Sequence, residues 1–170
     1  MNLRPANLAD IPKLLILHRA AAQTPNGIAR TPREITKKTI TNFLKPALKN
    51  GLIFVIENNQ KLIAEIHCYK YEPVCFKHTL ANLTLVVHPD FQGQGLGRKI
   101  FSHLLTEIQT HHREIARVEL FCRQSNPRGI SLYQSLGFVI EGICRNRILD
   151  AKGDLDGDTM MSWFNPAFKG

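Results

Sequence analysis

The spacing of hydrophobic positions predicts helices at the start of the chain. Residues 2–5 form a short extended segment, and the apolar positions of residues 11–17 then follow a helical period, with Asp10 placed to cap the helix. Residues 31–34 contain a capping box with proline at the first helical position, which predicts a second helix that runs towards Pro46. Two helices therefore precede the first long strand.

The middle of the chain changes to the continuous apolar runs that are typical of strands. Residues 52–71 predict an antiparallel pair joined by a turn at Asn58 and Asn59, because asparagine tolerates the left-handed backbone of tight turns. Residues 80–87 predict a third long strand. A glycine-rich loop follows, and residues 96–108 return to helical spacing with polar side chains mostly on the other side.

A second strand and helix complete the predicted fold. Residues 117–122 predict a strand, and Asn126 and Pro127 mark the start of a short helix that stops at Gly137. Two such units in succession favour neighbouring parallel strands. Residues 138–164 predict a closing hairpin, so the predicted fold class is α/β with a mixed sheet.

Composition and charge narrow the class of protein. The 170 residues are 44% apolar and 21% charged, which is typical of globular proteins, and no repeat or linker marks a boundary, so we expect one domain over residues 1–170. No apolar run approaches the roughly 20 residues of a membrane-spanning helix. Asp10 and Pro12 interrupt the segment where a secretory signal would be apolar, so we expect a cytoplasmic protein. The net charge of +8 favours an anionic ligand or partner.

The four cysteines do not form a pattern typical of metal binding or disulfides. They are irregularly spaced, with no C-x-x-C, at Cys68, Cys75, Cys122 and Cys144. We therefore expect reduced thiols and no metal site. A catalytic thiol is disfavoured because none of the four lies in a nucleophile-like motif.

The loop "VVHPDFQGQGLGRK", residues 86–99, is the strongest chemical signal in the chain. Gly93, Gly95 and Gly97 lie between a predicted strand and a predicted helix, with two basic residues directly behind them. Backbone N–H groups at a helix N-terminus bind phosphate well. A dinucleotide-binding G-x-G-x-x-G would need glycine at Arg98, and a P-loop would need serine or threonine after the lysine. Neither familiar phosphate motif fits, and a plain surface turn is disfavoured by the position between strand and helix.

Two segments resemble the GNAT superfamily of N-acetyltransferases. The first matches the family pattern Q/R-x-x-G-x-G/A, whose loop holds the pyrophosphate of acetyl-CoA, through Gln92, Gly95 and Gly97. The second matches the pattern N…LY…GF through Asn126, Leu132, Tyr133, Gly137 and Phe138. The predicted order of elements is similar over the whole chain. The resemblance implies a GNAT-type fold, with a mostly antiparallel central sheet flanked by helices and a splayed parallel strand pair at the acetyl-CoA site.

The resemblance also implies a set of binding residues and acetyl-CoA as co-substrate, without a metal. Leu85 and Val87 would offer backbone groups to the pantetheine arm, Asn126 would bond to the same arm, and Tyr133 would lie near the sulfur. The pyrophosphate would be bound by Gln92, Gly93, Gln94, Gly95, Gly97 and Arg98.

Acetyl transfer to an amine requires a proton donor for the leaving thiolate and a base for the amine. Tyr133 is the predicted general acid, since a phenol keeps its proton at neutral pH, although a tyrosine that only packs is the alternative. Many family members carry a carboxylate on the central strand or its neighbour, but Asn82 or Thr84 occupies that position here. Three candidates for the base remain: Glu65, which we put first, His67 and His88.

These observations predict direct acetyl transfer from acetyl-CoA to a primary amine of a small molecule or a protein. By resemblance, residues 21–35 and 145–160 would choose the acceptor, and a homodimer is compatible with the family. The alternative is a CoA-binding sensor or interaction module without catalysis; the missing strand carboxylate supports it, and Tyr133 argues against it. Nucleic-acid binding is disfavoured because the chain has no groove-reading motif.

Overall fold

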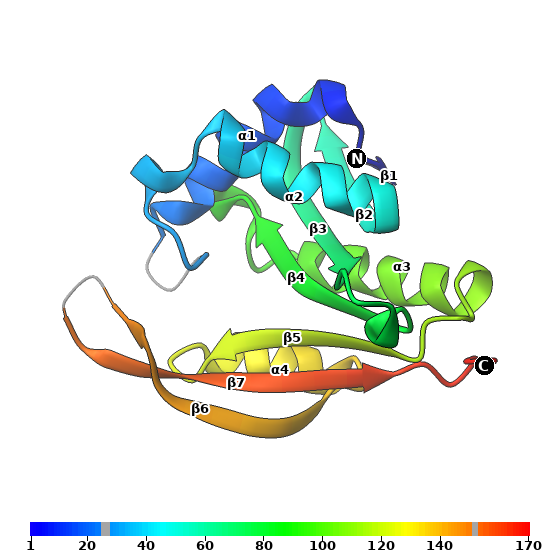
Figure 1. The fold of residues 1–170 in the computed structure, drawn as a ribbon. Helices are drawn as coiled ribbons and strands as arrows, with labels where there is room; N and C mark the ends of the chain where they lie inside the picture. Colours follow the sequence, from blue (N-terminus) through cyan, green and yellow to red (C-terminus); the bar gives the residue numbers. More distant parts are fainter. Residues whose placement is uncertain (25–27, 151–152) are drawn as a thin grey trace.

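The computed structural model describes residues 1–24, 28–150 and 153–170, which form a seven-stranded sheet with helices on both faces (Figure 1). In sheet order the strands are β1 (Asn2–Pro5), β2 (Gly51–Asn58), β3 (Lys61–Lys70), β4 (Thr79–Val87), β5 (Arg117–Arg123), β7 (Leu155–Phe164) and β6 (Val139–Leu149). The helices are α1 (Ile11–Ala22), α2 (Lys37–Asn50), α3 (Leu96–His111) and α4 (Pro127–Ser135). Only β4 and β5 pair in parallel within the described residues, which confirms the predicted mixed, mostly antiparallel sheet.

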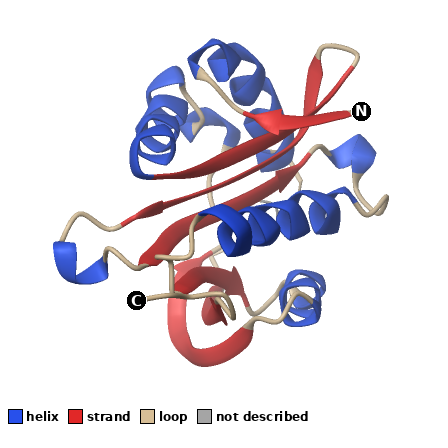
Figure 2. Cartoon of the chain, turned by 90° about the vertical axis from the view of Figure 1, so that its right-hand side faces the viewer, coloured by secondary structure: helices blue, strands red, loops and turns tan. Residues whose placement is uncertain are grey.

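Two hydrophobic cores hold the helices on the sheet. Side chains alternate along β2, so Ile53 and Val55 pack under α1 and α2 while Phe54 and Ile56 pack against α3. Figure 2 shows α1 and α2 on one side of the strands and α3 on the other. Burial of each such side chain contributes about 1.5–3 kcal/mol, and the two layers hold α1, α2 and α3 against the strands.

The sheet separates into two halves between β4 and β5. The two strands are in register only at Thr79 with Arg117 and at Leu80 with Val118, after which they diverge (Figure 1). A register shift between β3 and β4 coincides with Asn82, whose φ of +53° is left-handed. Such bulges bend a strand. The rest of β4 therefore has a partner on its β3 side and a gap on its β5 side, as the resemblance implied.

Two predictions about where the helices begin need correction. The carboxylate of Asp10 does not cap α1, because it accepts hydrogen bonds from Arg4 and from the backbone N–H of Asn7. The capping box of residues 31–34 is present but closes a single 3-10 turn, and α2 begins only at Lys37 because Ile35 is extended and fully buried. Helix α2 then continues through its internal proline to Asn50.

The turn between β2 and β3 lies one residue later than predicted. Its left-handed residues are Asn59 and Gln60, with φ of +47° and +64°. The other predicted elements are confirmed with small changes at their ends, including the closing hairpin of β6 and β7.

Candidate active site

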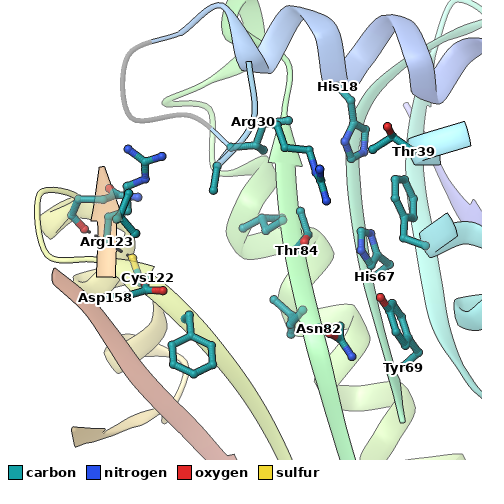
Figure 3. A pocket seen from close by; sticks show the side chains of 18 of the residues that line it. His18, Arg30, Thr39, His67, Tyr69, Asn82, Thr84, Cys122, Arg123 and Asp158 are labelled. Atoms are coloured by element: carbon teal, nitrogen blue, oxygen red, sulfur yellow. Dashed lines mark hydrogen bonds between the residues drawn. The ribbon is translucent and has the colours of Figure 1, made fainter. Parts of the chain in front are cut away.

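A cavity of about 530 Å³ occupies the gap between the two halves of the sheet. Figure 3 shows its two walls: side chains of β3, β4 and the α1–α2 region lie on one side, and side chains of β5 and β7 lie across from them. The predicted acceptor segments contribute Arg30, Ile148 and Asp158 to this lining. Residues 25–27 and 151–152 of those segments lie outside the described residues.

The glycine loop lies at the N-terminus of α3. Gly93 and Gly95 have φ of +78° and +77°, a region that disfavours a side chain, and Gly95 is the N-cap residue of the helix. A β-carbon at Gly95 would meet no described atom within 4 Å, so open space lies in front of the helix N-terminus. That space and the exposed N–H groups suit an anion.

Two arginines lie beside this loop. Arg98 donates a hydrogen bond of 2.7 Å from its guanidinium to the hydroxyl of Ser135, which ties α3 to α4. Arg128, in the first turn of α4, has a guanidinium nitrogen 3.7 Å from the place of a β-carbon on Gly93. The sequence analysis missed Arg128, because only the packing of α4 against the loop brings it there.

Along the edge of β4 that faces the gap, some backbone N–H and C=O groups do not hydrogen-bond with β3. His88 donates its N–H to the carbonyl of Ile63 at 2.8 Å, and hydrogen-bonded and non-hydrogen-bonded pairs alternate along an antiparallel ladder. Val87 and Leu85, opposite Ala64 and Ile66, are therefore in non-hydrogen-bonded pairs and direct their N–H and C=O groups towards the gap.

Asn126 and Tyr133 lie on the far side of the cavity, on or next to α4. The side-chain oxygen of Asn126 caps α4 by accepting from the N–H of Gly129 at 3.0 Å. The Tyr133 ring packs at 5.6 Å from that of Phe101, while its hydroxyl has no hydrogen bond with another described residue. Burial raises the pKa of Tyr133 above its usual range, and nearby Cys122 adds to this shift. The phenol therefore stays protonated at neutral pH.

Glu65 is fully buried and lies between two histidines. One carboxylate oxygen is 2.8 Å from Nδ1 of His67, and the other is 3.0 Å from Nε2 of His18 on α1. Burial alone would raise the pKa of Glu65, but the adjacent His67 and His18 outweigh it, so the pKa is lowered and the carboxylate is ionised at neutral pH. The Phe43 ring is parallel to His67, with 4.1 Å between ring centroids.

The structure separates the three base candidates. His67 lines the cavity, as does His18, which the sequence analysis did not single out. Glu65 reaches it only through these two rings. His88 lies at the end of β4 outside the cavity lining, where its ring packs against Phe91. Asn82 and Thr84 both line the cavity.

Charged groups are present on both walls of the cavity. Arg30 lies on the side of α1, and Arg123 and Asp158 lie across the gap (Figure 3). Burial raises the pKa of Asp158, partly offset by Arg147 and Arg123. Across the described ranges, no group of three His, Cys, Asp or Glu side chains could hold a metal ion, and no helix is both long and apolar enough to cross a membrane.

Comparison with known proteins defines the family. The model of the acetyltransferase (GNAT) domain matches residues 49–140, and the chain belongs to this family. It is 43% identical over 82 residues to the [ribosomal protein bS18]-alanine N-acetyltransferase of Salmonella typhimurium, which covers 48% of this chain and 53% of that protein. It is 42% identical over 67 residues to the L-amino acid N-acyltransferase MnaT of Escherichia coli, covering 38% and 36% of the two chains.

The chain spans about half the length of the first of these curated relatives and less of the second. The likeness in fold extends further. The structure of yncA from Salmonella typhimurium, solved with its cofactor acetyl-CoA, superposes with a TM-score of 0.85 over all of this chain and 96% of that one. At 22% identity, this likeness shows a shared fold.

Proposed function

We propose that this protein transfers the acetyl group of acetyl-CoA directly to a primary amine. The observation that carries the proposal is the juxtaposition of an anion-binding helix N-terminus with a strand edge whose backbone groups face an open gap. Acetyl-CoA has a matching shape, because it joins an anionic pyrophosphate to a long arm that contains amides. Its thioester supplies the activated acetyl group.

The binding roles follow from position. The amides of Gly93, Gly95 and Gly97 would hold the pyrophosphate, assisted by the side chains of Gln92, Gln94 and Arg98 and by the dipole of α3. Leu85 and Val87 would pair with the arm as a strand pairs with its neighbour, and the amide nitrogen of Asn126 would donate to it from the opposite wall. Arg128 adds positive charge beside the loop.

The chemical step requires little more than placement and proton transfer. A neutral amine attacks the carbonyl carbon, the C–N bond forms, and the C–S bond breaks as the tetrahedral intermediate collapses. The Tyr133 hydroxyl would protonate or hydrogen-bond the departing thiolate, and a base would take the proton released by the amine. No covalent enzyme intermediate is needed. The raised pKa of Cys122, about 11 because of burial, supports direct transfer, since a protonated thiol is a weak nucleophile.

The acceptor we propose is an α-amino group. The two relatives named above share this feature, since one is named for an alanine of a ribosomal protein and the other for L-amino acids. A protein N-terminus and a free amino acid differ in the carboxylate next to the amine, so simple probes can separate them.

The test measures release of free CoA thiol with three probes: L-alanine, a tripeptide amide with N-terminal alanine, and Nα-acetyl-lysine. We expect turnover with at least one of the first two. Binding of acetyl-CoA without thiol release for any probe would favour the non-catalytic CoA-binding module. Absence of acetyl-CoA binding by calorimetry would overturn the site itself.

A further inference from the structure

The group formed by His18, Glu65 and His67 has no role in the acetyl-CoA site described above. It is a chain of two hydrogen bonds in which both oxygens of one buried carboxylate contact an imidazole nitrogen. It joins two elements, since His18 lies on α1 and the other two residues lie on β3. Both rings line the cavity (Figure 3).

Resting on the proposed function, we propose that His67 is the general base for the acceptor amine and that Glu65 and His18 are positioning residues that set its tautomer. His67 contacts the acceptor through Nε2, and Glu65 acts only through the ring of His67.

The tautomer follows from the acceptor capacity of the carboxylate. An ionised carboxylate can only accept hydrogen bonds, so the ring nitrogen that faces it must carry hydrogen. Nδ1 of His67 is therefore the N–H nitrogen, and in the neutral ring Nε2 holds the lone pair. No described residue hydrogen-bonds Nε2. His67, which lines the cavity with 3% of its surface exposed, therefore keeps an unused proton acceptor at Nε2.

The ring is also held in one orientation. Phe43 stacks on His67 with an angle of 2° between the planes, and the hydrogen bond to Glu65 fixes rotation about the side chain. His18 occupies the second oxygen of Glu65, so the carboxylate cannot turn away without losing a bond. A base that is already oriented loses little entropy when the acceptor arrives.

The negative charge of Glu65 favours uptake of one proton by His67. With both rings neutral, the group carries the single negative charge of Glu65, and a proton on His67 creates an ion pair at 2.8 Å inside the protein. Such a pair is stronger in the interior than in water. The other charged or titratable lining groups are Arg30 and Tyr69 on this wall and, on the opposite wall, Cys122, Arg123, Tyr133 and Asp158. Helix α2 contributes only uncharged lining side chains.

His67 is favoured over the other two members by its place in the sheet. It is opposite Thr84 on β4, the strand along which we place the pantetheine arm. His18 lies on α1 rather than on a strand that pairs with β4. Glu65 has no exposed surface and both of its oxygens are occupied, so it cannot contact an acceptor.

The kinetic test compares four variants with the parent, using whichever of the three amine probes is acetylated. His67→Gln should lower kcat about 10²- to 10⁴-fold and remove the acidic limb of the pH–rate profile, with acetyl-CoA affinity unchanged. Glu65→Gln should lower kcat at least about tenfold and move that limb to lower pH, because the imidazolium loses its counter-charge. His18→Gln can still donate to Glu65, so the limb should remain.

The control is His103→Gln, which changes a histidine packed edge-on against Phe54, away from the cavity lining. Its kcat and pH profile should match the parent. The proposal is overturned if His67→Gln keeps the acidic limb at near-parental kcat, or if only His18→Gln loses it. Thermal melts and acetyl-CoA binding establish that each variant is folded.

A second measurement does not depend on an acceptor. Nitrogen-15 NMR of the imidazole side chains in the parent protein should show hydrogen on Nδ1 of His67 and on Nε2 of His18 at neutral pH. Hydrogen on Nε2 of neutral His67 would overturn the inference even in an active enzyme. The expected tautomers in a protein that acetylates no probe would leave the hydrogen-bonded group intact and refute the transferase proposal instead.

Discussion

Tyr133 and Cys122 line the same cavity, and both keep their protons at neutral pH, but they differ in what a proton permits. A protonated phenol can still donate to a leaving thiolate, whereas a protonated thiol cannot act as a strong nucleophile. The raised pKa of both groups therefore fits direct transfer with a tyrosine acid and does not fit an acyl-enzyme.

Tyr133→Phe tests the first half of this argument. The ring still packs against Phe101, so fold and acetyl-CoA affinity should change little. The lost hydroxyl acts mainly in the transition state, so kcat should fall at least about tenfold. Thiol release and calorimetric acetyl-CoA binding on the same preparation separate the two effects. A parental turnover rate would make Tyr133 a packing residue.

Cys122→Ala tests the second half. We expect turnover within about threefold of the parent and no burst of acetylated protein, because an essential nucleophile would make its loss far larger. Intact mass spectrometry after mixing with acetyl-CoA supplies the direct check. Complete inactivation of a folded variant would point to an acyl-enzyme.

At the scale of elements, the substitution Gly95→Val tests whether the loop before α3 binds phosphate. Valine at Gly95 meets no clash but must adopt a positive φ, at a cost of roughly 1–2 kcal/mol. It would also push the phosphates away from the amides, so acetyl-CoA affinity should fall at least about tenfold. Gly153→Val is the matched control, because Gly153 has a similar φ of +88° and equally open surroundings. Equal acetyl-CoA affinities of the two variants would contradict the phosphate role.

The ion pair of Arg4 with Asp10 joins β1 to the start of α1. Arg4→Met leaves a nearly buried carboxylate without its main partner and should cost about 1.5–3 kcal/mol at pH 7. The Arg4 hydrogen bond holds the pKa of Asp10 below its usual value, so the stabilisation is present above about pH 4 and is lost as pH falls through the lowered value. Urea unfolding at pH 7 and pH 3 should show that the difference in free energy of unfolding between the parent and Arg4→Met is smaller at pH 3. An equal difference at both pH values would count against the pairing of Arg4 with Asp10.

The local pattern of hydrophobic and polar residues predicted most helices and strands, but it did not predict every helix boundary or every side-chain contact. The capping box at Thr31 could be recognised in the sequence. It does not start a long helix, because the backbone is extended at Ile35, whose side chain is fully buried. Glu65 and His67 could be placed on one face of a strand from their spacing. Their link to His18 depends on how α1 packs over β3, which no local pattern contains.

At the scale of the molecule, the order of the strands in the sheet could not be predicted from the pattern of hydrophobic residues. Periodicity indicated a closing hairpin, but it did not indicate that β7 lies between β5 and β6. Two successive strand–helix units predicted a mixed sheet with neighbouring parallel strands, and the resemblance to a known family implied that these two strands are splayed. The homodimer and the choice of acceptor stay predictions.

The net charge of +8 and the proposed pyrophosphate site predict a ligand effect on the whole protein. Acetyl-CoA at about 100 times its Kd should stabilise the fold by about 2.7 kcal/mol, which raises Tm by about 5–10 °C in a chain of this size. Added salt should weaken the effect, because it screens the phosphate contacts. An unchanged Tm on addition of acetyl-CoA at low salt would contradict the proposed site.

The separation of β4 from β5 has a consequence for solvent exchange at single amides. The N–H groups of Leu85 and Val87 point into the gap, whereas those of Thr84 and Val86 face β3. In deuterated water the first pair should exchange much faster than the second, so that fast and slow amides alternate along one strand. Acetyl-CoA should slow Leu85 and Val87 selectively and make the exchange rates along β4 nearly uniform.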